Sequence, residues 1–83
     1  MIVMRAMVQA ADGTMRAKSP GTDVLVEVIE RGAEGQISVK FPIVNSNPLA
    51  SAEYCYIPSE DRIVKLLSVD CGITSFESVE ILT

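Results

Sequence analysis

The sequence predicts an α+β fold: a mostly antiparallel sheet of about five to six strands, with one helix packed on one face. Two apolar stretches, residues 2–18 and 24–41, each fold back on themselves around a turn signal. Short apolar strands follow in the C-terminal half, and residues 60–71 carry apolar side chains at helical spacing. At 83 residues the chain has room for a single domain, residues 1–83, with one modest core.

Residues 2–18 predict the first hairpin. Asp12 and Gly13 accept the positive φ angles of a type I′ turn, so a two-residue loop would join the two strands. Such a loop sets Gln9 opposite Arg16. The alternation along both strands then separates an apolar face from a more polar one, as a half-buried hairpin requires.

Residues 24–41 predict a second hairpin, with a glycine-flanked loop between its strands. Its outer face is not cleanly polar, because it carries Leu25 and Ile29. Either the C-terminal half of the chain covers these two side chains, or they meet another copy of the chain. The cross-strand pairs predicted for this hairpin are Glu27 with Lys40 and Val28 with Val39.

Two short strands complete the predicted sheet. Residues 54–57 form the first and are closed by Pro58, whose missing N–H cannot join a ladder. Residues 76–82 alternate between apolar and polar side chains and form the last strand.

A helix over residues 60–71 is predicted from its start signal and its spacing. Ser59 is a hydroxyl N-cap, and Glu60 and Asp61 face the positive end of the helix macrodipole. Apolar side chains then recur at helical intervals as far as Cys71.

The same residues allow a different structure. Residues 59–61 can form a turn that is followed by a strand over residues 62–69. The fold would then be an all-β small barrel, whose closure also removes the exposed sheet edges. This barrel is the alternative to the α+β prediction.

Several chemistries are excluded by composition. The chain has no histidine, so it lacks the usual general base and the commonest metal ligand. It has no glycine-rich phosphate loop. Cys55 and Cys71 are its only cysteines and lack metal-binding spacing. Because nothing else indicates an oxidising compartment, both are expected to be reduced, with a single disulfide as the alternative. We expect no cofactor and no metal site.

Charge and hydropathy limit the partners. Seven basic and eleven acidic residues give a net charge of −4, and residues 53–83 carry the acidic excess. Direct nucleic-acid binding is therefore not expected, whereas a basic protein partner is possible. No apolar run approaches the ~20 residues of a membrane-spanning helix, and the N-terminus has no signal-peptide pattern, so a cytoplasmic location is expected.

These observations favour a small acidic, non-enzymatic protein-binding or regulatory module. Its hydrophobic fraction of 48% is high for so small a body and predicts a homodimer or another homo-oligomer. The main alternative is a small-molecule-binding protein, with a pocket between sheet and helix or at a subunit interface. A Cys- or carboxylate-dependent enzyme is a weaker third hypothesis. The candidate interaction surface consists of Tyr54, Tyr56, Leu25, Ile29, Glu60 and Asp61.

Overall fold

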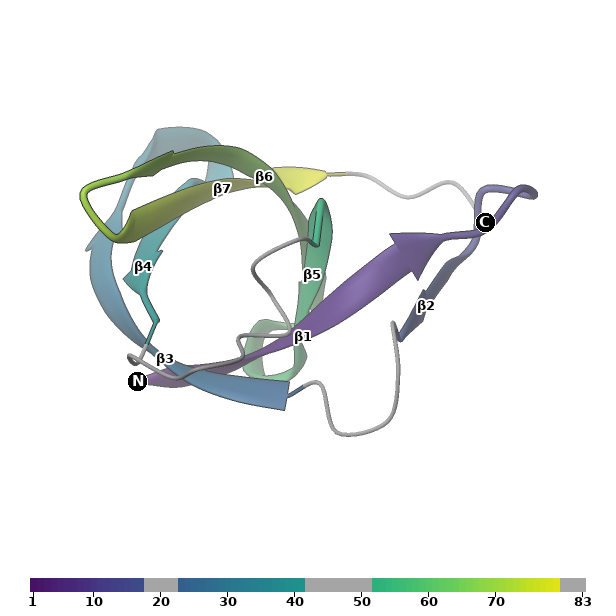
Figure 1. Ribbon diagram of the computed structural model, residues 1–83, viewed down its shortest axis with the longest axis horizontal. Coiled ribbons are helices and arrows are strands. Elements are labelled where there is room, and N and C mark those ends of the chain that lie inside the picture. Colours follow the sequence, from purple (N-terminus) through teal and green to yellow (C-terminus); the bar gives the residue numbers. More distant parts are fainter. Residues whose placement is uncertain (18–22, 42–51, 80–83) are drawn as a thin grey trace.

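Antiparallel strands form the whole framework of the computed structural model (Figure 1). The structure describes residues 1–17, 23–41 and 52–79, and within them seven strands form one sheet. Two short 3₁₀ turns, η1 (Ala33–Gly35) and η2 (Pro58–Glu60), connect strands. The strands are β1 (Ile2–Gln9), β2 (Met15–Ala17), β3 (Asp23–Arg31), β4 (Ile37–Lys40), β5 (Tyr54–Ile57), β6 (Arg62–Asp70) and β7 (Ile73–Val79).

Six of these strands close into a barrel. Hydrogen bonding runs in the order β1-β3-β4-β7-β6-β5, and β5 pairs again with β1. The closing ladder sets Arg5 opposite Tyr56 and Met7 opposite Tyr54. Closure satisfies backbone groups that an open sheet would leave at its two edges.

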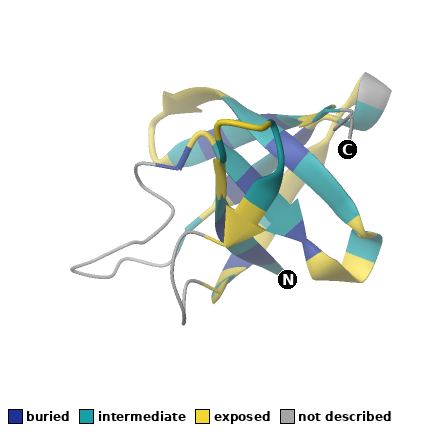
Figure 2. Cartoon of the chain, turned by 90° about the vertical axis from the view of Figure 1, so that its right-hand side faces the viewer, coloured by how far each residue is buried: buried dark blue, intermediate teal, exposed yellow. Residues whose placement is uncertain are grey.

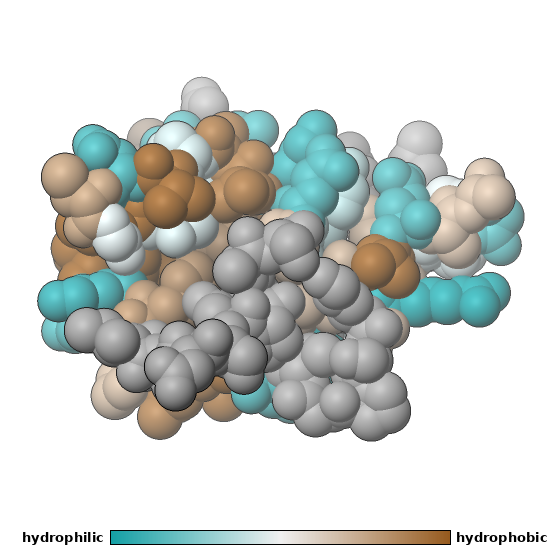
Figure 3. Space-filling view, viewed as in Figure 1, coloured by the Kyte–Doolittle hydropathy of each residue, from teal (hydrophilic) through white to brown (hydrophobic). Residues whose placement is uncertain are grey.

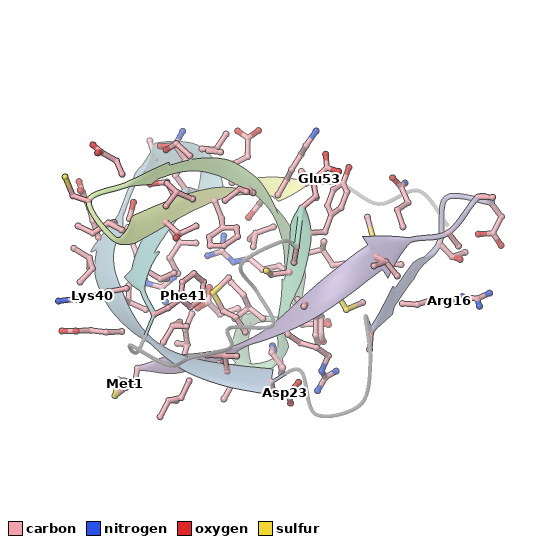
Figure 4. All side chains as sticks on the ribbon, in the orientation of Figure 1. Met1, Arg16, Asp23, Lys40, Phe41 and Glu53 are labelled. Atoms are coloured by element: carbon pink, nitrogen blue, oxygen red, sulfur yellow. The ribbon has the colours of Figure 1, made fainter. Side chains whose placement is uncertain are left out.

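β2 extends β1 beyond the barrel. Met7 pairs with Ala17 of β2 along one edge of β1 and with Tyr54 of β5 along the other. β3 also lies on the edge away from β5, where Asp23 pairs with Arg5. The outer half of β1 and β2 therefore project together as an arm, on which Arg16 points away from the barrel (Figures 1 and 4).

The barrel interior is filled by side chains. Phe41 points inward between the strands and packs against the buried residues (Figure 4). Burial alternates along the central strands, as Figure 2 shows, because successive side chains face opposite sides of a strand. The buried hydrophobic residues are Met4, Ala6, Val26, Ile37, Val39, Ala52, Cys55, Ile57, Val64 and Phe76.

The predicted helix over residues 60–71 is wrong, and with it the α+β class. The described residues contain no α-helix: η2 ends at Glu60, and β6 follows from Arg62. The all-β barrel alternative is the observed fold. A β-bulge explains the error, because the ladder with β7 shifts between Leu66 and Ser68 and makes Leu67 an extra residue. This insertion breaks the period of two and places apolar side chains at intervals that resemble those of a helix.

The predicted register of the first hairpin is wrong by one residue. Gln9 pairs with Met15 instead of Arg16, because the loop has three residues instead of two. Gly13 ends this loop with a φ of +89°, as in a type I turn followed by a left-handed residue. A shift of one residue turns each β2 side chain to the opposite face from the one predicted.

The second hairpin is confirmed where its strands are regular. Glu27 pairs with Lys40 and Val28 with Val39, and a bulge then makes Ile29 the extra residue. The strand over residues 54–57 is also confirmed. The last strand begins earlier than predicted, at Ile73, and residues 80–82 of the prediction lie outside the described residues. None of the described helical segments is long and apolar enough to span a membrane.

Candidate interaction surface

Two tyrosines face outward from β5. Cys55 and Ile57 are fully buried in the barrel, and alternation along the strand turns Tyr54 and Tyr56 to the outside. Both tyrosines are half-buried. The strand thus holds their rings at a fixed spacing on the barrel wall.

The ladders on both sides of β5 bring other side chains beside the tyrosines. β1 sets Arg5 next to Tyr56 and Met7 next to Tyr54, and β6 sets Ile63 next to Tyr56 and Lys65 next to Tyr54. Side chains directly opposite on antiparallel strands are close enough to interact. We call this two-row patch the tyrosine surface: Arg5, Met7, Tyr54, Tyr56, Ile63 and Lys65.

Each tyrosine ring of the surface is approached by one cation. The guanidinium carbon of Arg5 lies 5.7 Å from the centroid of the Tyr56 ring, and the Nζ atom of Lys65 lies 5.8 Å from that of Tyr54. Both distances are within the range of cation–π attraction. The rings therefore present electron-rich faces that already attract positive charge.

Carboxylates hold these two cations in place. Asp23 accepts hydrogen bonds from Arg5 at 2.8 and 3.2 Å, and Glu53 lies 3.6 Å from the Lys65 Nζ. The hydrogen bond and the charge of Asp23 raise the pKa of Arg5, and the bond from Arg5 lowers that of Asp23. Figure 4 shows Glu53 beyond the upper end of β5 and Asp23 below β1, and the space-filling view shows hydrophilic residues gathered at that upper end (Figure 3).

Asp61 fixes the far end of the Tyr56 side chain. The Tyr56 hydroxyl donates a hydrogen bond of 2.7 Å to Oδ1 of Asp61. This bond, with desolvation and the negative charge of Asp61, raises the pKa of Tyr56. Asp61 has a φ of +48°, in the left-handed region that aspartate tolerates better than most residues.

Glu60 belongs to a different cluster. Its two carboxylate oxygens accept hydrogen bonds from the Arg31 guanidinium at 3.0 and 2.7 Å. One of them also accepts a hydrogen bond from Arg62 Nε at 2.9 Å. Arg62 also donates to the Gly35 carbonyl at 2.8 Å and to the Ser78 hydroxyl. The bond from Arg31 and the charges of both arginines lower the pKa of Glu60. This network ties η1, η2, β3, β6 and β7 together and has a structural role.

Leu25 and Ile29 lie on β3, away from the tyrosine rings. They are 51% and 45% exposed, so the described part of the C-terminal half does not cover them. Leu25 pairs with Val3 across β1, while Ile29 is the bulged residue next to β4. Of the predicted surface, the structure thus brings together Tyr54, Tyr56 and Asp61 and separates them from Glu60, Leu25 and Ile29.

Four residues of the tyrosine surface were not predicted as site residues: Arg5, Met7, Ile63 and Lys65. The alternation in β1 places Arg5 and Met7 on the polar face of the first hairpin, which is a usable signal. Nothing local links that face to the tyrosines, because β1 meets β5 only when the barrel closes.

The cysteines offer little chemistry in this fold. Burial raises the pKa of the Cys55 thiol to about 12, so Cys55 is almost entirely protonated near neutral pH and is a poor nucleophile. Cys71 is exposed in the turn between β6 and β7, and both cysteines are free thiols. Within residues 1–17, 23–41 and 52–79, no group of three His, Cys, Asp or Glu side chains could hold a metal ion.

Comparison with known protein families, curated proteins and solved structures gives no match for this chain.

Proposed function

We propose that the protein is a non-enzymatic binding module that holds a protein partner on the tyrosine surface. The observation that carries this proposal is the side-by-side placement of Tyr54 and Tyr56, with Met7 and Ile63 as apolar neighbours. Tyrosine, methionine and arginine are enriched in protein interfaces, and tyrosine and arginine are enriched among the residues that dominate binding energy.

The rigidity of the surface adds support. Tyr56 is held by Asp61, and Arg5 is held by Asp23. Side chains that are already fixed lose less conformational entropy when a partner binds. The two tyrosines also sit on a strand of a closed barrel, which positions them more precisely than a loop would.

The proposal is tested by capture of partners from lysate of the source cells. A Tyr54→Thr/Tyr56→Thr variant keeps β-branched residues on β5 and should retain the fold, as checked by circular dichroism. We expect it to lose the proteins that the wild type enriches. Val69→Thr, near the end of β6 and 66% exposed, is the matched control and should capture the same proteins as the wild type. Identical capture by the double variant would overturn the proposal.

We also propose that the protein self-associates through a second, separate contact. The support is the exposure of Leu25 and Ile29 on β3. Sedimentation equilibrium should give about twice the chain mass of 9.0 kDa, and Leu25→Thr/Ile29→Thr should return the mass to that of one chain. A wild-type monomer at all concentrations would contradict this part.

The described residues contain no α-helix that could form a wall of the pocket predicted between sheet and helix. Small-molecule binding itself, including a site at a subunit interface, stays a prediction.

A further inference from the structure

We infer that the partner of the tyrosine surface is an extended basic segment that carries lysine or arginine at alternate positions. The inference rests on the proposed function and names the chemistry of its partner. It combines three features of the surface: rings that attract cations, a surplus of carboxylates, and a spacing that matches an extended chain.

Each tyrosine ring already has a cationic side chain of the same protein above it. Arg5 and Lys65 come from different strands, β1 and β6, yet each lies over one tyrosine. Both tyrosines are half-buried, so each keeps part of its surface accessible. A cation supplied by a partner would be attracted to the ring surface that Arg5 and Lys65 leave uncovered, and such contacts gain strength when the partner excludes water.

Carboxylates outnumber cations around the rings. Arg5 and Lys65 are each matched by a carboxylate of their own, Asp23 and Glu53. Glu77 lies opposite Lys65 in the β6–β7 ladder, and no residue in the described ranges forms an ion pair with it. Asp61, at the Tyr56 hydroxyl, likewise has no cationic partner among the described residues. Glu77 and Asp61 therefore leave uncompensated negative charge at the surface.

The spacing of the tyrosines suits an extended peptide. Tyr54 and Tyr56 are two residues apart on β5 and face the same side. In an extended segment, side chains at positions i and i+2 also share a face and repeat at about 6.6–7 Å. A segment lying along β5 would thus bring alternate basic side chains to the two rings, with Asp61 and Glu77 as acceptors.

Charge argues against two other occupants. A second copy would bring the same acidic surplus, since the chain has a net charge of −4. A phosphate-bearing ligand would be repelled by Asp61 and Glu77. Electrostatic complementarity favours a basic partner and suppresses these acidic ones.

The composition of the chain supplies a direct readout. It contains two tyrosines and no tryptophan, so its intrinsic fluorescence comes only from Tyr54 and Tyr56. We would titrate the full chain with a short, end-capped peptide of alternating lysine and threonine. The expected result is a saturable change in tyrosine emission whose dissociation constant rises with salt. A glutamate–threonine peptide of the same length should give no change.

Charge variants locate the contact. Asp61→Asn keeps a residue that tolerates positive φ, and Glu77→Gln keeps the side-chain size. Together they should weaken binding of the lysine peptide roughly two- to tenfold, the effect of one or two partly screened charge pairs. Glu27→Gln, on β3 and paired with Lys40, is the matched control and should leave the affinity unchanged.

Three results would overturn the inference: no saturable change with the lysine peptide, an equal change with the glutamate peptide, or unaltered affinity in the Asp61/Glu77 variant. The proposed function and the basic partner are tested by different experiments. If the tyrosine double variant loses its captured partners while the lysine peptide does not bind, the binding module stands and the basic partner is wrong.

Discussion

The hydroxyl of Tyr56 and the carboxylate of Asp61 are joined by a hydrogen bond of 2.7 Å across the turn that connects β5 to β6. Asp61 closes that turn in the left-handed conformation, so one residue both shapes the backbone and fixes the outer end of a tyrosine on the candidate surface. The turn and the tyrosine surface are therefore coupled.

This bond predicts a change in the pKa of Tyr56. In a Tyr54→Phe background Tyr56 is the only tyrosine, and Asp61→Asn should lower its pKa toward the ordinary value of 10.0 because the bonded carboxylate is gone. Because the pKa of Tyr56 is raised in the folded protein, the bond to Asp61 stabilises the fold fully below pH 10. This stabilisation is lost as the pH rises through the raised pKa of Tyr56. Ultraviolet absorbance during alkaline titration measures the shift. Equal pKa values with and without Asp61 would show that the bond does not persist in solution.

Glu60→Gln should destabilise the barrel by about 1–3 kcal/mol, because Arg31 and Arg62 lose their shared carboxylate. Because the pKa of Glu60 is lowered in the folded protein, the stabilisation by Glu60 depends on pH. The stabilisation is present above the ordinary value of 4.5 and is lost as pH falls through the lowered folded-state pKa. Urea unfolding at neutral and acid pH should therefore show the variant and wild type converging in acid.

Glu53→Gln is the control for this network. Glu53 pairs with Lys65 at the surface, where its side chain is 65% exposed. Such pairs contribute at most about 1 kcal/mol. A loss as large as that of Glu60→Gln would contradict the structural role assigned to Glu60.

Gly35→Ala should cost more free energy of unfolding than Gly13→Ala. Both glycines have positive φ, +76° and +89°, which costs an alanine about 1–2 kcal/mol. A Cβ at Gly35 would also lie 2.6 Å from the Ser78 Oγ, whereas one at Gly13 meets nothing within 4 Å. Chemical unfolding of both variants separates the steric effect from the backbone effect, and equal losses would show that Ser78 moves aside freely.

The two thiols should differ sharply in labelling. In the folded protein Cys71 should react with a thiol reagent at neutral pH, while Cys55, buried and with its pKa near 12, should react only on unfolding. Mass spectrometry of wild type and Cys71→Ser reports this directly. Fast labelling of the Cys71→Ser variant would mean that β5 opens readily.

The sequence predicts those parts of the fold that depend on local pattern. The pairing of Glu27 with Lys40 and the strand over residues 54–57 are confirmed, because alternation and turn residues specify them. Tyr54 and Tyr56 face the same outer side of the barrel and are half-buried there, since alternation on β5 decides which side chains face outward. Their role as an interaction surface stays a prediction.

Where prediction failed, a competing interaction explains the failure. In the first loop, Oδ1 of Asp12 accepts hydrogen bonds from the backbone N–H and hydroxyl of Thr14 at 3.0 and 2.6 Å. These bonds stabilise the three-residue loop over the two-residue turn that Asp12 and Gly13 suggested. In β6, the bulge at Leu67 interrupts the alternation of a strand, so the apolar residues recur at helical intervals. Arg5 could not be assigned to Tyr56 because β1 meets β5 only when the barrel closes. Lys65 could not be assigned to Tyr54 because residues 60–71 were predicted as a helix instead of a strand that pairs with β5.

The ladder between β1 and β5 decides when the tyrosine surface can form. β1 precedes the other strands in the chain, yet one of its pairing partners, β5, follows in the second half of the sequence, and β4 must wait for β7. Such non-local pairing makes folding slow compared with local hairpin formation. A nascent chain on the ribosome could form the second hairpin early, but it could not assemble the tyrosine surface, which needs β1, β5 and β6 side by side. The tyrosine surface is thereby restricted to finished molecules, and an incompletely translated chain does not carry it.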